Sequence, residues 1–241
     1  MKEKIRSEWN EFKVLLRNVP ATVTSLFIVA VVVMNLLANK ELSFGWAVTD
    51  CGIIASWMAF LTSDMMTKRF GPKAAIELSL FAEVINLGVC AIFFIVSLIP
   101  NNWAMAYDLG ETANDALNAT FGGTWYVLMG STVAFIASSI INAYLNAGIG
   151  KLCKKDNFVA YALRSYVSTA IGQFSDNFIF ALIVSYVFFG WTIGQCVIAA
   201  CITGVIELIC EVIFGGFGYK TLRRWEALGI GEEYLKLRGE M

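Results

Sequence analysis

Residues 74–99 read AAIELSLFAEVINLGVCAIFFIVSLI, and this stretch decides the fold class. A helix crosses the hydrocarbon core of a bilayer with about 20 mostly apolar residues, so the stretch is long enough to span a membrane. The whole chain has the same character: 58% of its 241 residues are apolar, 15% are charged and its mean hydropathy is +0.66. Because soluble domains carry about 25% charged residues, the sequence predicts a membrane protein.

The chain contains six apolar stretches of spanning length, separated by charged or polar segments. They are residues 20–38, 44–62, 74–99, 124–148, 165–189 and 192–217. The second is the least regular because it contains Asp50. The first follows a charged segment and lacks a small-residue cleavage motif, so we expect a retained signal anchor. The connecting loops are too short for a soluble domain, and we predict one all-α integral membrane domain over residues 1–241.

Lysine and arginine lie almost entirely in alternate segments between the spans. Of the 18 basic residues, 17 precede the first span, lie in the loops 63–73 and 150–164, or follow the last span. Because positive residues collect on the cytoplasmic side, both termini are expected to be cytoplasmic. Residues 2–17 alternate charges with apolar side chains such as Trp9. This head segment fits either a short amphipathic helix on the inner surface or a solvated tail with an interfacial tryptophan.

Several carboxylates lie within the predicted spans, where each costs a few kcal/mol unless it faces a partner, a cavity or an interface. They are Asp50, Glu77, Glu83, Asp176, Glu207 and Glu211, with Asp64 at the inner end of the second span. No lysine lies deep in a span to neutralise them. We therefore expect some of these acids to be protonated or to contact a ligand.

Spacing indicates which polar side chains share a helix face, because positions three or four apart are neighbours. The pairs Glu83 with Asn86 and Glu207 with Glu211 each meet this condition.

The fifth span carries a third group, in which Gln173, Asp176 and Phe180 follow one another along one face. A carboxylate can accept two parallel N–H donors from a planar heterocycle, an amide can bind its carbonyl, and an aromatic ring can stack on it. The stripe therefore favours a binding site for such a molecule. The alternative for a single asparagine or glutamine is a packing hydrogen bond between helices.

The chain lacks the residues that most enzyme and cofactor chemistry would need. The chain has no histidine, its six cysteines show no C-x-x-C spacing, and it contains neither a G-x-S-x-G elbow nor a Walker loop. We therefore expect no enzyme activity, no cofactor and no metal. A net charge of −1 and a pI of about 5.6 give no basic surface for nucleic acid.

Two groups of small residues predict close packing between helices. They are Ala-Ser-Ser at 137–139 and Gly-Gly-Phe-Gly at 215–218. A helix broken at Gly215 is the alternative for the second group.

Three segments carry recognisable motifs. Residues 60–64 read FLTSD, followed by Phe70-Gly71 and Ala74-Ala75, and residues 35–40 read NLLANK. Residues 168–176 read STAIGQFSD, which resembles the S-T-x-x-(G/S)-(N/Q)-x-x-D signature in the fifth span of the VUT (vitamin uptake transporter) family, the YhhQ-type transporters. The other two segments also resemble that family, whose first span ends in N-x-x-A-x-K. With six spans and a cytoplasmic N-terminus, the likeness covers nearly the whole chain.

The resemblance implies a multi-pass importer of queuosine precursors in the bacterial inner membrane. The expected substrates are 7-cyano-7-deazaguanine, 7-aminomethyl-7-deazaguanine or queuine. The implied fold is that of the substrate-binding subunits of energy-coupling-factor importers, acting without their ATPase module. The candidate substrate-binding residues are Asp176, Gln173, Phe180, Glu83, Asn86, Asn35, Glu211 and Glu207. Asp64 and Arg164 match the family pattern near the cytoplasmic end, where we expect them to pair or to act in gating or coupling.

The sixth span departs from the family pattern. The family carries a lysine about where Glu207 stands and a proline about where Phe217 stands. The departure changes the charge of the site, so another purine or a vitamin-like molecule also fits.

Three hypotheses of function follow. The first is a secondary importer of a deazapurine, driven by protons and acting alone or as a homodimer. The second is a vitamin- or purine-binding subunit that needs a partner ATPase module, for which Ala55-x-x-x-Ala59 offers a docking motif. The third is a scaffold or membrane enzyme that transports nothing.

Overall fold

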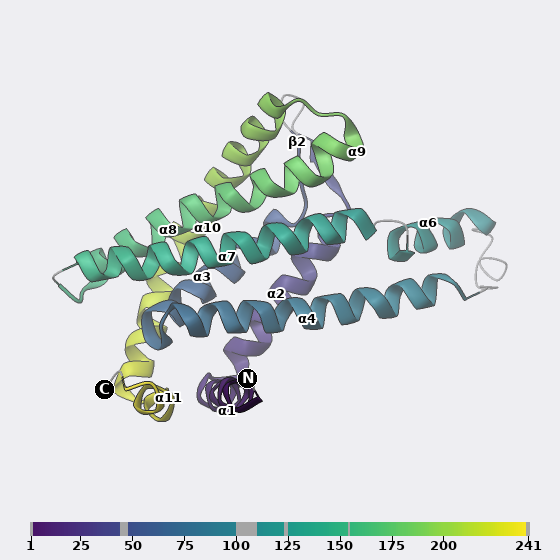
Figure 1. Cartoon of the computed structure of the whole chain (residues 1–241). Helices are drawn as coiled ribbons and strands as arrows, with labels where there is room; N and C mark the ends of the chain where they lie inside the picture. The colour runs from purple at the N-terminus through teal and green to yellow at the C-terminus, as the bar shows by residue number, and fades with distance from the viewer. Residues whose placement is uncertain (1, 44–47, 100–109, 123–124, 154, 240–241) are drawn as a thin grey trace.

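The computed structural model describes residues 2–43, 48–99, 110–122, 125–153 and 155–239, and these are almost entirely helical (Figure 1). Six long helices form the bundle: α2 (Ala21–Leu37), α3 (Ile53–Phe70), α4 (Pro72–Ser97), α7 (Trp125–Leu152), α8 (Phe158–Phe180) and α10 (Ile193–Ala227). The shorter elements are α1 (Lys2–Asn18), strands β1 (Glu41–Ser43) and β2 (Val48–Asp50), α6 (Gly110–Gly122), the π-helix η1 (Ala181–Tyr186), α9 (Val187–Phe189) and α11 (Glu232–Leu237). Each predicted span overlaps one long helix.

The second predicted span, 44–62, is wrong at both of its ends. Its first four residues lie outside the described residues, β2 occupies residues 48–50, and α3 runs from Ile53 to Phe70. Strands β1 and β2 pair antiparallel. A Cβ at Gly52 would lie 2.8 Å from the main-chain oxygen of Met34 in α2, so the chain turns from β2 into α3 where only glycine fits. Asp50 therefore lies on a strand at the end of the bundle and not within a helix.

Two further helices begin at polar caps, which hydropathy does not detect. Helix α8 begins at Phe158, where the Asn157 side chain accepts a hydrogen bond from the N–H of Ala160 at 3.0 Å. Helix α10 begins with a capping box between Thr192 and Gln195. It continues to Ala227 through charged residues that a search for apolar runs leaves out.

Helix α10 is unbroken at Gly215, so the alternative of a broken helix there is wrong. A Cβ at Gly215 would lie 2.8 Å from the Tyr166 hydroxyl, and one at Gly218 would lie 3.0 Å from the Tyr161 hydroxyl. The glycines of this helix therefore allow close packing, as the sequence predicts. The motif Ala55-x-x-x-Ala59 is also used inside the bundle, because both alanines are buried. It offers no docking surface to a partner, which corrects that expectation.

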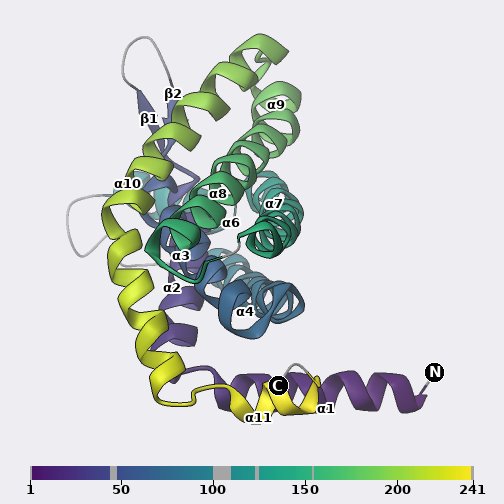
Figure 2. The same cartoon turned by 90° about the vertical axis from the view of Figure 1, so that its left-hand side faces the viewer.

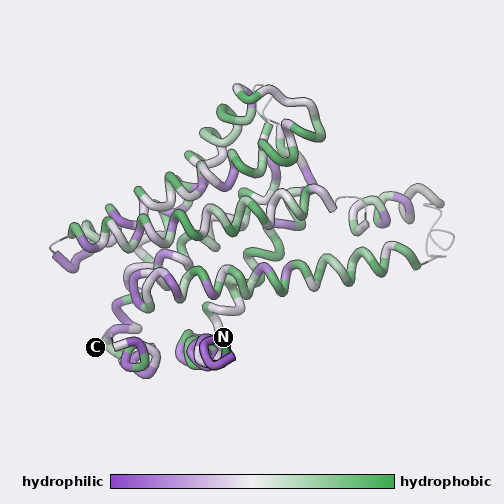
Figure 3. The backbone as a smooth tube through the Cα atoms, in the orientation of Figure 1, coloured by the Kyte–Doolittle hydropathy of each residue, from purple (hydrophilic) through white to green (hydrophobic). Residues whose placement is uncertain are grey.

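The bundle is apolar outside, and many polar side chains lie inside it beside an apolar core. Its outward side chains include Val84, Ile213 and Phe217, which are 66%, 67% and 71% exposed. Its buried side chains include many polar ones, such as Asp64 and Gln173. Figure 3 shows apolar residues along the long helices, with hydrophilic residues gathered toward α1 and α11. This distribution is that of a protein whose outer surface contacts lipid.

Four helical stretches are long and apolar enough to cross a membrane: Pro72–Ser97, Asp115–Leu152, Phe158–Phe189 and Ile193–Ala227. Helices α1 and α2 pass the same test only as a pair, which is bent by 105°. The sequence of α3 includes Asp64, Lys68 and Arg69, which lower its hydropathy. Length and composition alone therefore show a multi-pass membrane protein with four or five spans.

Helices α1 and α11 lie together at one end of the bundle, across the direction of the long helices (Figure 2). Residues 2–18 are thus helical, as the first alternative for the head segment predicts. Glu11 of α1 receives hydrogen bonds from Lys73 of α4 at 2.8 Å and from Arg238 at 2.9 Å. At the same end, the loop between α7 and α8 is held by Asp156, and a hydrogen bond from Lys68 lowers the pKa of this carboxyl group. Ion pairs therefore fasten this end of the molecule.

Candidate functional site

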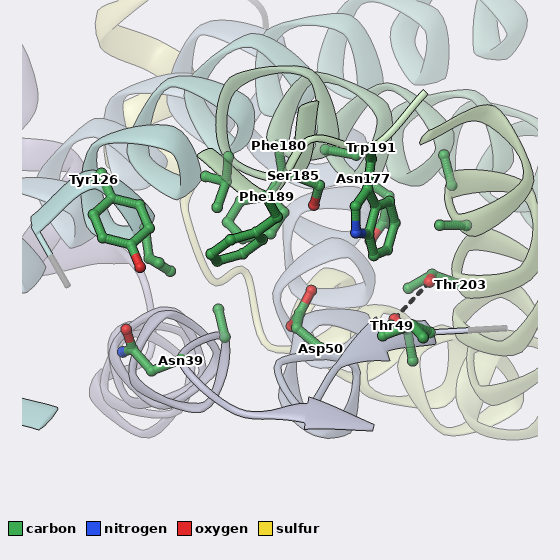
Figure 4. A pocket seen from close by; sticks show the side chains of 17 residues that line it. Asn39, Thr49, Asp50, Tyr126, Asn177, Phe180, Ser185, Phe189, Trp191 and Thr203 are labelled. Atoms are coloured by element: carbon green, nitrogen blue, oxygen red, sulfur yellow. Dashed lines mark hydrogen bonds between the residues drawn. The ribbon is translucent and has the colours of Figure 1, made fainter. Parts of the chain in front are cut away.

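A cavity of about 210 Å³ lies at the end of the bundle opposite α1 and α11 (Figures 1 and 4). The residues just after α2, strand β2, helices α7, α8 and α10, and the η1–α9 segment all contribute to its wall. Its polar and aromatic lining residues are Asn39, Thr49, Asp50, Tyr126, Asn177, Phe180, Ser185, Phe189, Trp191 and Thr203. A cavity with many aromatic rings and a few polar groups is the usual form of a small-molecule site.

The aromatic wall depends on a change of helix type after α8. The chain continues from Phe180 into the π-helix η1, whose residues Ala181, Val184 and Ser185 line the cavity. Single π-helical turns are rare and occur often at functional sites. Gly190, with φ +71°, then reverses the chain, and the N–H of Trp191 donates to the Ser185 carbonyl at 3.1 Å. The π-turn and this reversal together bring Trp191 to the cavity.

Strand β2 forms the opposite wall. The hydroxyl oxygens of Thr49 and Thr203 lie 2.7 Å apart, which ties the strand to α10. The Asp50 carboxylate accepts a hydrogen bond from the N–H of Gly52 at 2.7 Å. Figure 4 shows the Asp50 side chain pointing from the strand toward the aromatic residues.

A smaller hollow of about 30 Å³ adjoins the cavity on its inner side and holds two more acids. It shares Ala38, Asp50, Asn177 and Phe180 with the cavity, and adds Asp176 and Glu207. Three of the predicted site residues, Asp176, Phe180 and Glu207, therefore lie in one place with Asp50.

Neutral donors hold both of these inner acids. Asp176 accepts a hydrogen bond from the Ser138 hydroxyl at 2.8 Å. Glu207 accepts from the amide of Asn177 at 2.9 Å and from the Ser56 hydroxyl. Ser138 belongs to the Ala-Ser-Ser group that we expected to serve packing alone, so it has a polar contact that the expectation missed. No lysine or arginine pairs with Asp176 or Glu207 within the described part of the chain. The negative charge of these two acids is therefore available to bind a proton or a ligand.

Gln173 lies one turn before Asn177 on α8 and is completely buried. Its main-chain oxygen accepts from the Asn177 amide at 2.9 Å, but neither atom of its side-chain amide has a hydrogen-bond partner among the described residues. Buried amides are almost always paired, so an unpaired one calls for an explanation. A packing hydrogen bond, the alternative for this residue, is not what the structure shows.

Three other predicted residues form a separate group behind the hollow. Glu83 accepts hydrogen bonds from Asn86 at 3.2 Å, from Thr132 at 3.2 Å and from Asn35 at 3.4 Å. The oxygen of the Asn35 amide accepts from the hydroxyl of Ser131, which lines the hollow. Spacing thus predicted the Glu83–Asn86 contact correctly, but these acid and amide groups do not line the cavity.

The remaining predicted residues lie nearer to α1 and α11. Asp64 and Glu211 both contact the hydroxyl of Ser165. Arg164 donates to the Asn146 amide oxygen at 2.8 Å and makes no ion pair with Asp64. The expected Asp64–Arg164 pair is therefore wrong, because Asn146 takes the guanidinium of Arg164 and uncharged donors surround Asp64.

The sequence left Asn177, Ser138 and Trp191 out of the site. Asn177 follows Asp176 directly, and this adjacency was the available signal. Asp50 was noticed as an acid but assigned to a helix, and Trp191 depends on a turn that periodicity does not show. No group of three or more histidine, cysteine or acidic residues in the described ranges could hold a metal ion.

Comparison with known proteins shows which protein family this chain matches. Residues 50–224 match the profile of the family described as "Putative vitamin uptake transporter". A protein of Bacillus subtilis (strain 168) named "Probable queuosine precursor transporter" is 24% identical over 154 residues. That match spans 64% of this chain and 64% of the relative's length. No solved structure matches the chain.

Proposed function

This chain belongs to the vitamin uptake transporter family, and we propose that it imports a queuosine precursor across the bacterial inner membrane. The observation that carries the substrate class is the meeting of Asp50, Asp176 and aromatic rings in the cavity and the hollow that adjoins it. The name of the Bacillus subtilis relative supports the same class.

The arrangement of the helices supports six spans. Helix α1 contacts α11 through Glu11 and Arg238, so the two ends of the chain lie on one side of the membrane. The number of crossings between them must then be even. Helix α2 runs from α1 to the β-hairpin at the opposite end and α3 returns, so both cross together (Figure 1). With the four stretches that qualify by hydropathy, they make six.

The positive-inside distribution of lysine and arginine supports a cytoplasmic position for α1 and α11. The cavity, at the opposite end, faces the outside of the cell. A substrate arriving from outside therefore meets the aromatic wall first and the buried acids afterwards.

A deazaguanine has the groups that this cavity would recognise. Its N1–H and 2-amino group can both donate to one carboxylate, for which Asp176 and Asp50 are the candidates. Its carbonyl can accept from an amide such as that of Asn177, and its fused rings can lie against Phe180 or Trp191. Drug-sized ligands occupy sites of about 300–1,000 Å³. At about 210 Å³, this cavity suits a compact two-ring molecule.

We propose secondary transport driven by the proton gradient, because buried acids without basic partners can carry protons through the membrane. The partner-dependent alternative loses its sequence support, since Ala55 and Ala59 are buried.

The first test is thermal stabilisation of the purified protein by queuine, the two deazaguanine precursors, guanine and a set of vitamins. A ligand that binds only the folded state raises the melting temperature. We expect a shift with the deazaguanines that is lost in Asp176→Asn, because this change keeps the shape and removes the charge. The matched control is Glu233→Gln at the opposite end, whose side chain is 63% exposed. A shift with a vitamin alone would identify a vitamin, in place of a deazaguanine, as the substrate. No shift with any compound would contradict import of a queuosine precursor.

A further inference from the structure

A second group of buried polar side chains lies between the cavity and the cytoplasmic end and shares no residue with the cavity lining. It joins Asp64 of α3, Asn142 of α7, Ser165 and Thr169 of α8, and Glu211 of α10. Asp64 and Glu211 are completely buried. Two acids thus meet inside the bundle at the crossing of four helices.

Counting hydrogen atoms shows that two ionised acids do not fit here. The Ser165 oxygen lies 2.5 Å from Oε1 of Glu211 and also within hydrogen-bonding distance of Oδ2 of Asp64. A serine hydroxyl has one hydrogen and can donate to only one of these oxygens, while ionised carboxylates can only accept. The second contact is a hydrogen bond only if one of the two carboxyl groups carries a proton and donates it to the Ser165 oxygen.

The donors around each acid indicate which one carries the proton. Asp64 accepts from the Asn142 amide at 2.8 Å and from the Thr169 hydroxyl at 3.1 Å, so it has donors besides Ser165. Glu211 Oε2 has no hydrogen-bond partner among the described residues. The ionised form is therefore better supported at Asp64, and the neutral form fits Glu211.

We propose that Asp64 and Glu211 form a proton-binding site, in which Glu211 donates to Ser165 and Ser165 donates to Asp64. The role of this site in coupling rests on the proposed transport function. The coupling proton is assigned to this pair and not to the acids of the cavity. On release, the proton leaves the Glu211 carboxyl group, which becomes a carboxylate, and passes toward the cytoplasm.

A side chain near the pair has no hydrogen-bond partner and is suited to stabilise the state in which the proton has left. The Tyr161 hydroxyl is buried, has no hydrogen-bond partner within the described ranges, and lies in the field of both Asp64 and Glu211. It also faces Gly218, which is on the same face of α10 as Glu211 because seven residues make about two turns. A donor without an acceptor is costly when buried, so this hydroxyl is suited to a carboxylate that forms during the cycle.

Other titratable groups also lie around the pair. On α8 these are Arg164 and Tyr166, and Glu207 lies one turn along α10. Arg164 donates to Asn146 and forms no ion pair with Asp64, while α7 contributes only amides. Lys68, one turn after Asp64 on α3, pairs with Asp156 at 2.6 Å. Among the described residues, no lysine or arginine therefore forms an ion pair with Asp64 or Glu211.

Infrared difference spectra of the purified, substrate-free protein between neutral and alkaline pH test the site without any substrate. Among the bands of protonated carboxyl groups, we expect one that Glu211→Gln removes and that Ser165→Ala shifts in frequency. The matched control is Glu83→Gln, which changes an equally buried glutamate with three donors of its own and keeps the band. Protonated-carboxyl bands that Glu211→Gln leaves unchanged, or stabilisation by sodium over potassium that this variant abolishes, would overturn the proposal.

Proteoliposomes test the coupling with radiolabelled queuine. One pH unit is worth about 1.4 kcal/mol, so wild-type protein that moves one proton per substrate should accumulate it about tenfold across such a gradient. Glu211→Gln should still exchange labelled for unlabelled queuine but reach only equal concentrations on both sides. Glu233→Gln should accumulate like the wild type. Full accumulation by Glu211→Gln would overturn the assignment, whereas a wild-type protein that binds no heterocycle would contradict the proposed function and leave the infrared result standing.

Discussion

At the scale of single residues, Gln173 offers a test that separates binding from packing. Its buried amide is unpaired, and an unpaired buried polar group costs about 1–3 kcal/mol. Gln173→Leu keeps a similar volume without polar atoms, so it should raise the melting temperature of the ligand-free protein. If the amide contacts the substrate, the same variant should weaken queuine binding by about tenfold, or 1.4 kcal/mol. Thermal unfolding with and without queuine measures both effects.

Asn86→Leu is the matched control for that variant. Asn86 is equally buried, but its amide donates to Glu83 at 3.2 Å. Its replacement should lower the melting temperature, because a buried acid then loses a donor. A lower melting temperature for Gln173→Leu as well would show that the Gln173 amide stabilises the free protein.

The sequence predicted single polar residues well where one helix contains both partners. The Glu83–Asn86 contact follows from spacing alone. Spacing cannot place partners on other helices, so the contacts of Asp176 with Ser138 and of Arg164 with Asn146 were beyond it. Hydropathy indicates that an acid lies at depth, and only the packing of helices decides which neighbour it meets.

At the scale of elements, the π-helix η1 should depend on Gly130 of α7. A Cβ at Gly130 would lie 2.4 Å from a methyl carbon of Val184, a buried residue of η1 that lines the cavity. Gly130→Ala should therefore destabilise the protein by about 1–3 kcal/mol, as overpacking does, and weaken ligand binding through the displaced cavity wall. Gly148→Ala, in the same helix with no atom within 4 Å of the added carbon, should instead stabilise it by about 0.5–1 kcal/mol. Denaturation in detergent compares the two, and equal effects would contradict the role given to Gly130.

Long apolar helices could be predicted from the sequence, and elements fixed by local contacts could not. The run at 74–99 appears almost unchanged as α4, which begins at Pro72 directly after Gly71, where φ is +88°. Strands β1 and β2 are too short for a period of two to stand out, and β2 lies inside a run that passes as helical. The π-turn at 181–186 leaves no trace in the hydropathy pattern, since its residues are as apolar as those before them.

At the scale of the whole molecule, the two ends of the bundle differ in chemistry. One end is fastened by ion pairs of α1, α4 and α11, and the other holds an aromatic cavity with its acids. The proposed proton site lies between them. In the proposed orientation, this order puts the substrate site on the outer side and the proton site on the path inward, which is the arrangement that an importer driven by the external proton concentration needs.

The contact between α1 and α11 makes the topology testable. Because Glu11 binds both Lys73 and Arg238, the termini cannot lie on opposite sides of the membrane while this structure is intact. Fluorescent-protein reporters, which mature in the cytoplasm, should therefore be bright at either terminus, and alkaline phosphatase there should be inactive. After truncation at residue 122, three of the six proposed spans precede the fusion point, so phosphatase fused there should be active outside. Phosphatase activity at one terminus alone would mean an odd number of spans, and it would contradict both the six-span topology and the outward-facing cavity.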